Sequence, residues 1–200
     1  FLAQHSVPHV LAWCFPKSPG HHAVGFDNQK SGRAIAEHVI SYGHRKLGVI
    51  AGLRDGNDRA QDRILGIQDA INAHPNIQLL GLQECKYSFE EAGSALDELL
   101  LGPVHPTAII CGSDVLAVGA MLRARDLGLQ IPEDISITGF DDINLARVTT
   151  PGLTTVRVPQ HDMGRKAAHV LLGLLDADAP QPQSYELMTT IIDRGTLARV

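Results

Sequence analysis

Six side chains of the sequence combine charge, hydrogen-bonding groups and aromatic surface near points where apolar segments end. Carboxylates and a guanidinium can bind pairs of hydroxyl groups, and aromatic rings can cover the apolar face of a ligand. The pair Asp141-Asp142 is the most informative, because folding does not need two adjacent acids after an apolar strand. These residues predict a binding site for a polyhydroxylated or heterocyclic small molecule. The candidate binding residues are Trp13, Asp27, Arg63, Tyr87, Ser113 and Asp141.

The carboxylates also have structural interpretations. The helix that starts at this point is expected to be capped by Ser113 or Asp114, with Asp114 a cap rather than a ligand contact, and Asp142 is expected to cap a turn. Strand-end residues such as Asp141 often terminate strands. A chemical alternative is that Asp27, Asp114 and Asp141 form an acid–base pair or a Mg²⁺ site.

The other candidates have structural alternatives too, and no catalytic signature accompanies them. Trp13 and Tyr87 are equally compatible with core packing, and Arg63 with ion pairs on its own helix surface. Ser113 and a histidine would make a nucleophile–base pair, but no spacing supports one. Nucleotide-loop, nucleophile-elbow and zinc-protease motifs are absent, so we expect no enzyme, no catalytic residue and no cofactor. The 10 histidines and 3 cysteines do not fall at metal-ligand spacing.

The composition is that of a globular protein. The 200 residues are 44% hydrophobic and 20% charged, enough for one large domain or two small ones. A net charge of −5 argues against a nucleic-acid-binding surface on this segment. No apolar run is long enough to span a membrane and no secretion signal is visible. Three scattered cysteines are typical of reduced thiols, so we expect a cytoplasmic protein.

Short β-branched runs alternate with segments of helical period, which predicts an α/β fold with a parallel sheet and helices on both faces. Ligands of such sheets bind beyond the carboxyl ends of the strands. A segment with two prolines, 177–184, is predicted to be a linker. The predicted strands are 7–12, 23–26, 47–51, 80–84, 107–111, 135–140, 153–158 and 185–192, and the predicted helices are 29–42, 58–73, 88–101, 113–127 and 160–175.

Three blocks of the sequence resemble the LacI/GalR repressor family. The first begins Val24-Gly-Phe-Asp-Asn28 and continues through 36–46 and 49–52. The second is 106–114 with 117–120. The third, the most specific, begins Ile131-Pro-Glu-Asp-Ile-Ser-Ile-Thr-Gly-Phe-Asp-Asp142 and continues through 153–156 and 163–164. Residues 193–196 resemble the terminal strand of the family, so the resemblance covers nearly the whole chain.

The resemblance implies two Rossmann-like subdomains of the periplasmic-binding-protein type, joined by three crossover segments, with an effector bound between them. Residues 1–26 and 157–182 would form the N-terminal subdomain, and 27–156 and 183–200 the C-terminal one. The N-terminal subdomain is expected to be incomplete. A helix-turn-helix headpiece and the first strands and helices would lie upstream of Phe1.

Individual residues match positions of the family's effector site. Arg63 matches an arginine that contacts the effector, Tyr87 an aromatic residue that stacks on it, and Asp141 an acid that accepts hydrogen bonds. Asp27 matches an acid at the cleft, and Trp13 an aromatic residue on the N-terminal side.

Ser113 departs from the family pattern, which has asparagine there, and the shorter side chain lacks the amide donor. The implied function is allosteric. A sugar-like or nucleobase-like effector shifts the conformation of a homodimer, and operator DNA is bound only through the headpiece. The segments 114–127 and 143–148 are candidate dimer surfaces. Two alternatives share the fold: a periplasmic sugar-binding protein of a transport system, and an enzyme.

Overall fold

The computed structural model describes residues 7–16, 20–175 and 182–200, which form two compact units. Unit 1 comprises Phe1–Asn28 and Pro159–Thr189, and unit 2 comprises Gln29–Val158 and Thr190–Val200. Residues 177–181 of the predicted linker lie outside the described residues. None of the described helices is long and apolar enough to cross a membrane. The predicted α/β class is confirmed, and each unit contains a sheet dominated by parallel pairs.

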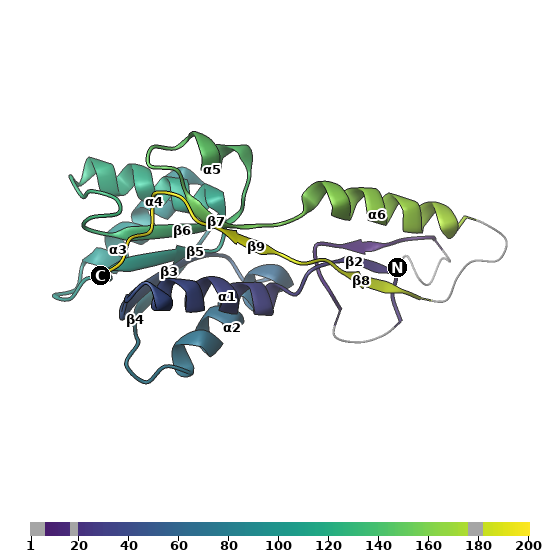
Figure 1. Cartoon of the computed structure of the whole chain (residues 1–200), viewed down its shortest axis with the longest axis horizontal. Coiled ribbons are helices and arrows are strands. Elements are labelled where there is room, and N and C mark those ends of the chain that lie inside the picture. The colour runs from purple at the N-terminus through teal and green to yellow at the C-terminus, as the bar shows by residue number, and fades with distance from the viewer. Residues whose placement is uncertain (1–6, 17–19, 176–181) are drawn as a thin grey trace. The chain divides into compact units, whose positions relative to one another are not determined.

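Unit 2 is built on a six-stranded sheet with the strand order β4-β3-β5-β6-β7-β9. The helices α3 and α4 lie on one face of this sheet, and α1 and α2 lie on the other (Figure 1). The strands are β3 (Lys46–Gly52), β4 (Gln78–Cys85), β5 (Ala108–Cys111), β6 (Ser136–Asp141), β7 (Thr154–Arg157) and β9 (Thr190–Ile192). The helices are α1 (Asn28–Ser41), α2 (Asp58–Asn72), α3 (Phe89–Leu100), α4 (Asp114–Asp126) and α5 (Asn144–Val148).

The core of unit 2 explains why these segments form strands and helices. Ile50, Ile109 and Ile137 of three neighbouring strands are fully buried, as the continuous apolar runs predict. They share one apolar cluster with Leu96 of α3 and Leu116 of α4. Burying each such side chain contributes about 1.5–3 kcal/mol.

The contact between α1 and α2 places the most buried charged side chain of the candidate site. A Cβ on Gly66 would lie 1.9 Å from the carbonyl oxygen of Gln29, and one on Gly32 would lie 2.3 Å from that of Arg63. Only glycine allows two backbones to approach so closely. The two helices are therefore in backbone contact at the turn that carries Arg63.

The strand order of unit 2 reverses between β3 and β5, because the chain leaves β3 for β4 on one side and then crosses to β5 on the other. The loops that follow these two strands therefore diverge, and ligands of open α/β sheets bind at such a point. The loop after β3 begins at Leu53, and the one after β5 is Gly112-Ser113. This edge of the sheet is where the candidate residues of unit 2 should meet.

Unit 1 contains a three-stranded parallel sheet of order β1-β2-β8, with β1 (Leu11–Ala12), β2 (Ala23–Gly25) and β8 (Ser184–Glu186). One described helix, α6 (Gln160–Gly173), contacts β1 and β2. Of its apolar residues only Met163 is fully buried. Strand β1 is shorter than the predicted strand 7–12.

The structure corrects three expectations at the end of the chain. The strand predicted over 185–192 is two strands, β8 and β9, which belong to different sheets. Residues 184–186 pair with β2 in unit 1, although the expected boundary assigned 183–200 to the C-terminal subdomain. Strand β9 pairs antiparallel with β7, so the sheet of unit 2 is not wholly parallel. The chain passes between the units at Thr189–Thr190, which no local pattern marks.

Candidate functional site

Arg63 and Asp141 meet at the carboxyl edge of the sheet in unit 2. The Arg63 side chain is 9% exposed, its Nη1 donates to the carbonyl oxygen of Gly112 at 2.7 Å, and its Nη2 lies 3.4 Å from Oδ1 of Asp141. The guanidinium also lies 3.8 Å from the centroid of the Phe140 ring. Arg63 is thus held by strand ends from across the sheet, and surface pairing on its own helix does not describe it.

Burial controls the charges of this pair. It raises the pKa of Asp141 to about 6, although Arg63 and Arg59 act in the opposite direction. Burial also lowers the pKa of Arg63, while the negative charge of Asp141 favours the protonated guanidinium. A partly exposed carboxylate and a buried guanidinium therefore stand side by side, and together they can accept and donate hydrogen bonds.

Ser113 and Asp114 have different structural roles at the start of α4. Ser113 is the N-cap of α4, because its backbone is extended and its Oγ accepts from the Leu116 N–H at 3.2 Å. Of the two predicted caps, Ser113 is therefore confirmed, and the interpretation of Asp114 as the cap is wrong. Asp114 is fully buried and accepts hydrogen bonds from the Ile143 N–H at 2.8 Å and the Thr155 hydroxyl at 2.5 Å. Burial raises the pKa of Asp114 to about 7.

Tyr87 stands at the same edge of the sheet and is not a core residue. It is 48% exposed, and Nδ2 of Asn57 donates to its hydroxyl at 3.3 Å. A Cβ on Gly52, the last residue of β3, would lie 2.3 Å from the Tyr87 hydroxyl oxygen. The absence of a side chain at Gly52 leaves the space that the ring occupies. Because the ring is largely exposed, core packing is the wrong interpretation of Tyr87.

Sequence reasoning missed an ion pair at this edge. Arg54 follows β3 and Glu84 lies near the end of β4, and their side chains form hydrogen bonds of 2.9 Å and 2.5 Å. The pair also lowers the pKa of Glu84. The rule that strand ends carry the site would have found both residues, because β3 and β4 end together in the register of the sheet.

The prediction that Asp142 caps a turn is wrong. Its side chain is 1% exposed and binds the arginines at positions 147, 157 and 194. Burial acts to raise the pKa of Asp142, but the hydrogen bonds and charges of these arginines outweigh it and lower the pKa.

Trp13 and Asp27 belong to unit 1, although the expected boundary assigned Asp27 to the C-terminal subdomain. The Trp13 ring packs edge-on against Phe26 at 6.4 Å, and its backbone N–H lies 3.3 Å from Sδ of Met163. Nδ2 of Asn28 donates to the Trp13 carbonyl oxygen at 2.9 Å. Trp13 has a φ of 71°, a conformation that a bulky residue rarely adopts, so these contacts hold a strained residue in place. Asp27 follows β2 and is half-buried.

The described residues contain no group of three or more His, Cys, Asp or Glu side chains that could hold a metal ion. The fold and the polar sheet edge are those of an α/β ligand-binding domain. Residues 36–197 match the family model of the periplasmic binding protein-like domain. The chain belongs to this family, as an effector-binding domain of the LacI/GalR type, which confirms the resemblance drawn from its motifs.

Curated relatives and solved structures agree with this assignment. The chain is similar to the HTH-type transcriptional repressor PurR of Shigella sonnei, with 32% identity over 190 residues, 94% of this chain and 55% of the relative. It therefore spans about half the length of the curated relatives it matches. A structure described as a sugar-binding transcriptional regulator of the LacI family from Escherichia coli, complexed with phosphate, is 27% identical. Its TM-score is 0.84, over 98% of this chain and 70% of that one.

The dimeric Lac repressor with an 11-residue C-terminal deletion is similar in fold, with a TM-score of 0.88 at 24% identity. That match covers 96% of this chain and 70% of the other.

Proposed function

We propose that this chain is the small-molecule sensor of a cytoplasmic transcriptional regulator, with its ligand bound at the carboxyl edge of the sheet in unit 2. The observation that carries the proposal is the buried Arg63 guanidinium, which lies on the Phe140 ring and against the largely buried Asp141. Folding does not require an arginine and an acid near the point where the strand order reverses, and ligands of such sheets bind there. The regulator relatives support the same function and favour a binding protein over an enzyme.

The charges favour a neutral ligand rather than an anion. Asp141 balances the charge of Arg63, and Glu84 balances that of Arg54, so the site offers paired donors and acceptors. Such pairs suit the hydroxyl groups of a sugar or the edge of a heterocycle. The exposed ring of Tyr87 would cover the flat face of either ligand.

Three further contacts rest on the family resemblance. Ser113 is supported by its position next to Gly112, whose carbonyl oxygen accepts from Arg63. Its hydroxyl already accepts one hydrogen bond as the helix cap and would donate to the ligand. Trp13 and Asp27 of unit 1 are proposed as the remaining contacts. Binding would stabilise one conformation of the domain and change the affinity of an upstream headpiece for operator DNA.

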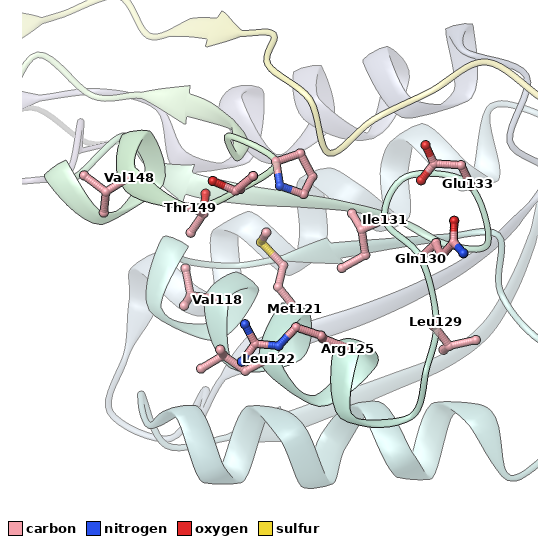
Figure 2. A pocket seen from close by; sticks show the side chains of 12 residues that line it. Val118, Met121, Leu122, Arg125, Leu129, Gln130, Ile131, Glu133, Val148 and Thr149 are labelled. Atoms are coloured by element: carbon pink, nitrogen blue, oxygen red, sulfur yellow. The ribbon is translucent and has the colours of Figure 1, made fainter.

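A second copy of this chain is the proposed partner at α4. A groove of about 610 Å³ runs along α4, with walls from the segment after this helix and from the end of α5 (Figure 2). Apolar side chains in the groove are exposed, including Leu122 at 37% and Val148 at 75%. The predicted dimer surfaces 114–127 and 143–148 contribute to it, and the similar Lac repressor is described as dimeric.

Sedimentation of two charge variants tests the dimer. Val148→Glu places a charge in the groove and should make the chain monomeric, because burying a carboxylate at an apolar interface opposes association. Leu101→Glu is the matched control, since Leu101 is also 75% exposed but does not line the groove. If both variants have the mass of the parent protein, the groove is not the interface.

A thermal-shift screen tests ligand binding. The chain is melted with sugars, sugar phosphates, nucleosides and purine bases, because a ligand of the folded state raises the melting temperature. Asp141→Asn and Tyr87→Ala should abolish the shift. Asp97→Asn should keep it, because Asp97 pairs with Arg123 between α3 and α4. A ligand that shifts all variants equally would place the site elsewhere.

A further inference from the structure

The Asp141-Asp142 loop has a backbone conformation that its residues do not favour. Asp141 has a φ of 112° and Asp142 a φ of 53°. Positive φ values strain non-glycine residues and persist only when surrounding contacts hold them. The loop therefore needs an anchor, and this is the conformation in which Asp141 lies against Arg63.

The carboxylate of Asp142 is that anchor. Its side chain is 1% exposed, although the residue lies in a loop. Oδ1 accepts from Nη2 of Arg194 at 2.5 Å, and Oδ2 accepts from Nε of Arg157 at 2.7 Å. Arg147 adds a weaker contact of 3.4 Å. Several charge-assisted hydrogen bonds to one buried carboxylate oppose the strain of the two residues and hold the loop.

Two of these arginines stand where the chain connects the units. Arg157 ends β7, is in register with Asp141 on one side and with Thr190 on the other, and precedes Pro159 by two residues. The chain crosses between the units at Val158–Pro159 and at Thr189–Thr190. Arg194 follows β9 and is itself fixed, because its Nη1 donates to the Leu153 carbonyl oxygen at 2.6 Å.

We infer that Asp142 is a positioning residue that holds Asp141 against Arg63 by binding Arg157 and Arg194. Through these two arginines, Asp142 also links the Asp141-Asp142 loop to two of the three connections between the units. A change in this loop on ligand binding is then transmitted to the residues of unit 2 from which those two connections start. The role concerns the site of the proposed function, but it is read from Asp141 itself and needs no ligand.

The test is a pH titration of Asp141 in the full chain, monitored by carbon NMR of its carboxyl group. The charged groups around it are Arg63 and Arg59 on α2 and Asp114 on α4. In the parent protein burial places the pKa of Asp141 at about 6, against an ordinary 3.8. A carboxylate that leaves its place loses this burial, so its pKa falls.

Arg157→Gln separates positioning from simple electrostatics. Loss of a nearby positive charge alone would raise the pKa of Asp141, whereas release of the loop lowers it by about one unit or more. Asp142→Asn and Asp142→Gly should lower it too, and glycine accepts the positive φ so that the fold is kept. Arg123→Gln, which removes an arginine bound to Asp97 instead, should leave it unchanged.

The inference is overturned if the pKa of Asp141 rises or stays constant in Arg157→Gln, or stays constant in both Asp142 variants. A thermal-shift screen in which no compound binds would refute the proposed function and leave this inference standing. If the Arg157 and Asp142 variants bind a ligand normally and the pKa of Asp141 is unchanged in them, the inference is refuted and the proposed function stands.

Discussion

The substitution Asp114→Asn should remove a large pH dependence from the stability of this protein. Asp114 is fully buried, and its oxygens accept from the Ile143 N–H and the Thr155 hydroxyl. An asparagine of the same shape keeps one oxygen for Ile143. Its NH₂ group can donate to Thr155, because a hydroxyl group also accepts. The variant therefore keeps both contacts and loses only the ionisable group.

The magnitude follows from the pKa. Burial raises the pKa of Asp114 from 3.8 to about 7 in the folded protein. A raised folded-state pKa contributes stability that is fully present below the unfolded value and is lost as the pH rises through the folded value. The upper bound for about three units is roughly 4 kcal/mol, lost between pH 4 and pH 7. Asp141, with a pKa of about 6, contributes in the same direction.

Urea denaturation at a series of pH values from 4 to 8 measures this difference. The free energy of unfolding of Asp114→Asn minus that of the parent protein should rise with pH and level off above about pH 7. Asp97→Asn, at a side chain that is 39% exposed, should show no such rise. A difference between Asp114→Asn and the parent protein that is constant across this range would refute the assignment of a buried, proton-binding Asp114.

Three further predictions concern packing and a buried histidine. Gly66→Ala should destabilise unit 2 by about 1–3 kcal/mol in urea denaturation, because its Cβ would meet the backbone of α1. Gly164→Ala, a helical position with nothing within 4 Å, should instead stabilise by up to about 1 kcal/mol, and equal effects would contradict the packing argument. Gly52→Ala should shift the ring resonances of Tyr87 with less than about 1 kcal/mol of destabilisation, because this exposed side chain can move aside. Burial lowers the pKa of His44, so the stability that it contributes is present above its ordinary pKa of 6.5 and is lost as the pH falls below it. His44→Gln should lack this loss in acid denaturation, and an unchanged acid limb would show that His44 is not responsible.

Local signals determined most of the elements of this fold. The helix predicted over 58–73 is α2, Asp58–Asn72, because an apolar stripe at helical spacing must face the sheet. The strand predicted over 47–51 is β3, Lys46–Gly52, because an uninterrupted apolar run suits a strand with both faces covered. The capping pattern at Ser88 marked the start of α3 correctly, since its hydroxyl accepts from the Glu91 N–H.

The periodicity failed where elements were short or where sheets changed. The helix α5 has only five residues, too few to establish a helical period. The residues of β8 and β9 look like one strand locally, and only their pairing with β2 and β7 separates them. Strand pairing depends on distant partners, which a local pattern does not contain.

The sequence by itself also determined which types of residue border the site, because parallel strands end at one edge of their sheet and polar residues follow those ends. Only the tertiary structure decided which of them meet. It brought Arg63 of α2 to Asp141 and Gly112 across the sheet. It also made Asp114 a buried acceptor rather than a helix cap, and surrounded Asp142 with arginines from three segments. The reason is physical: the charge, strain and burial of each carboxyl group depend on neighbours that are distant in sequence.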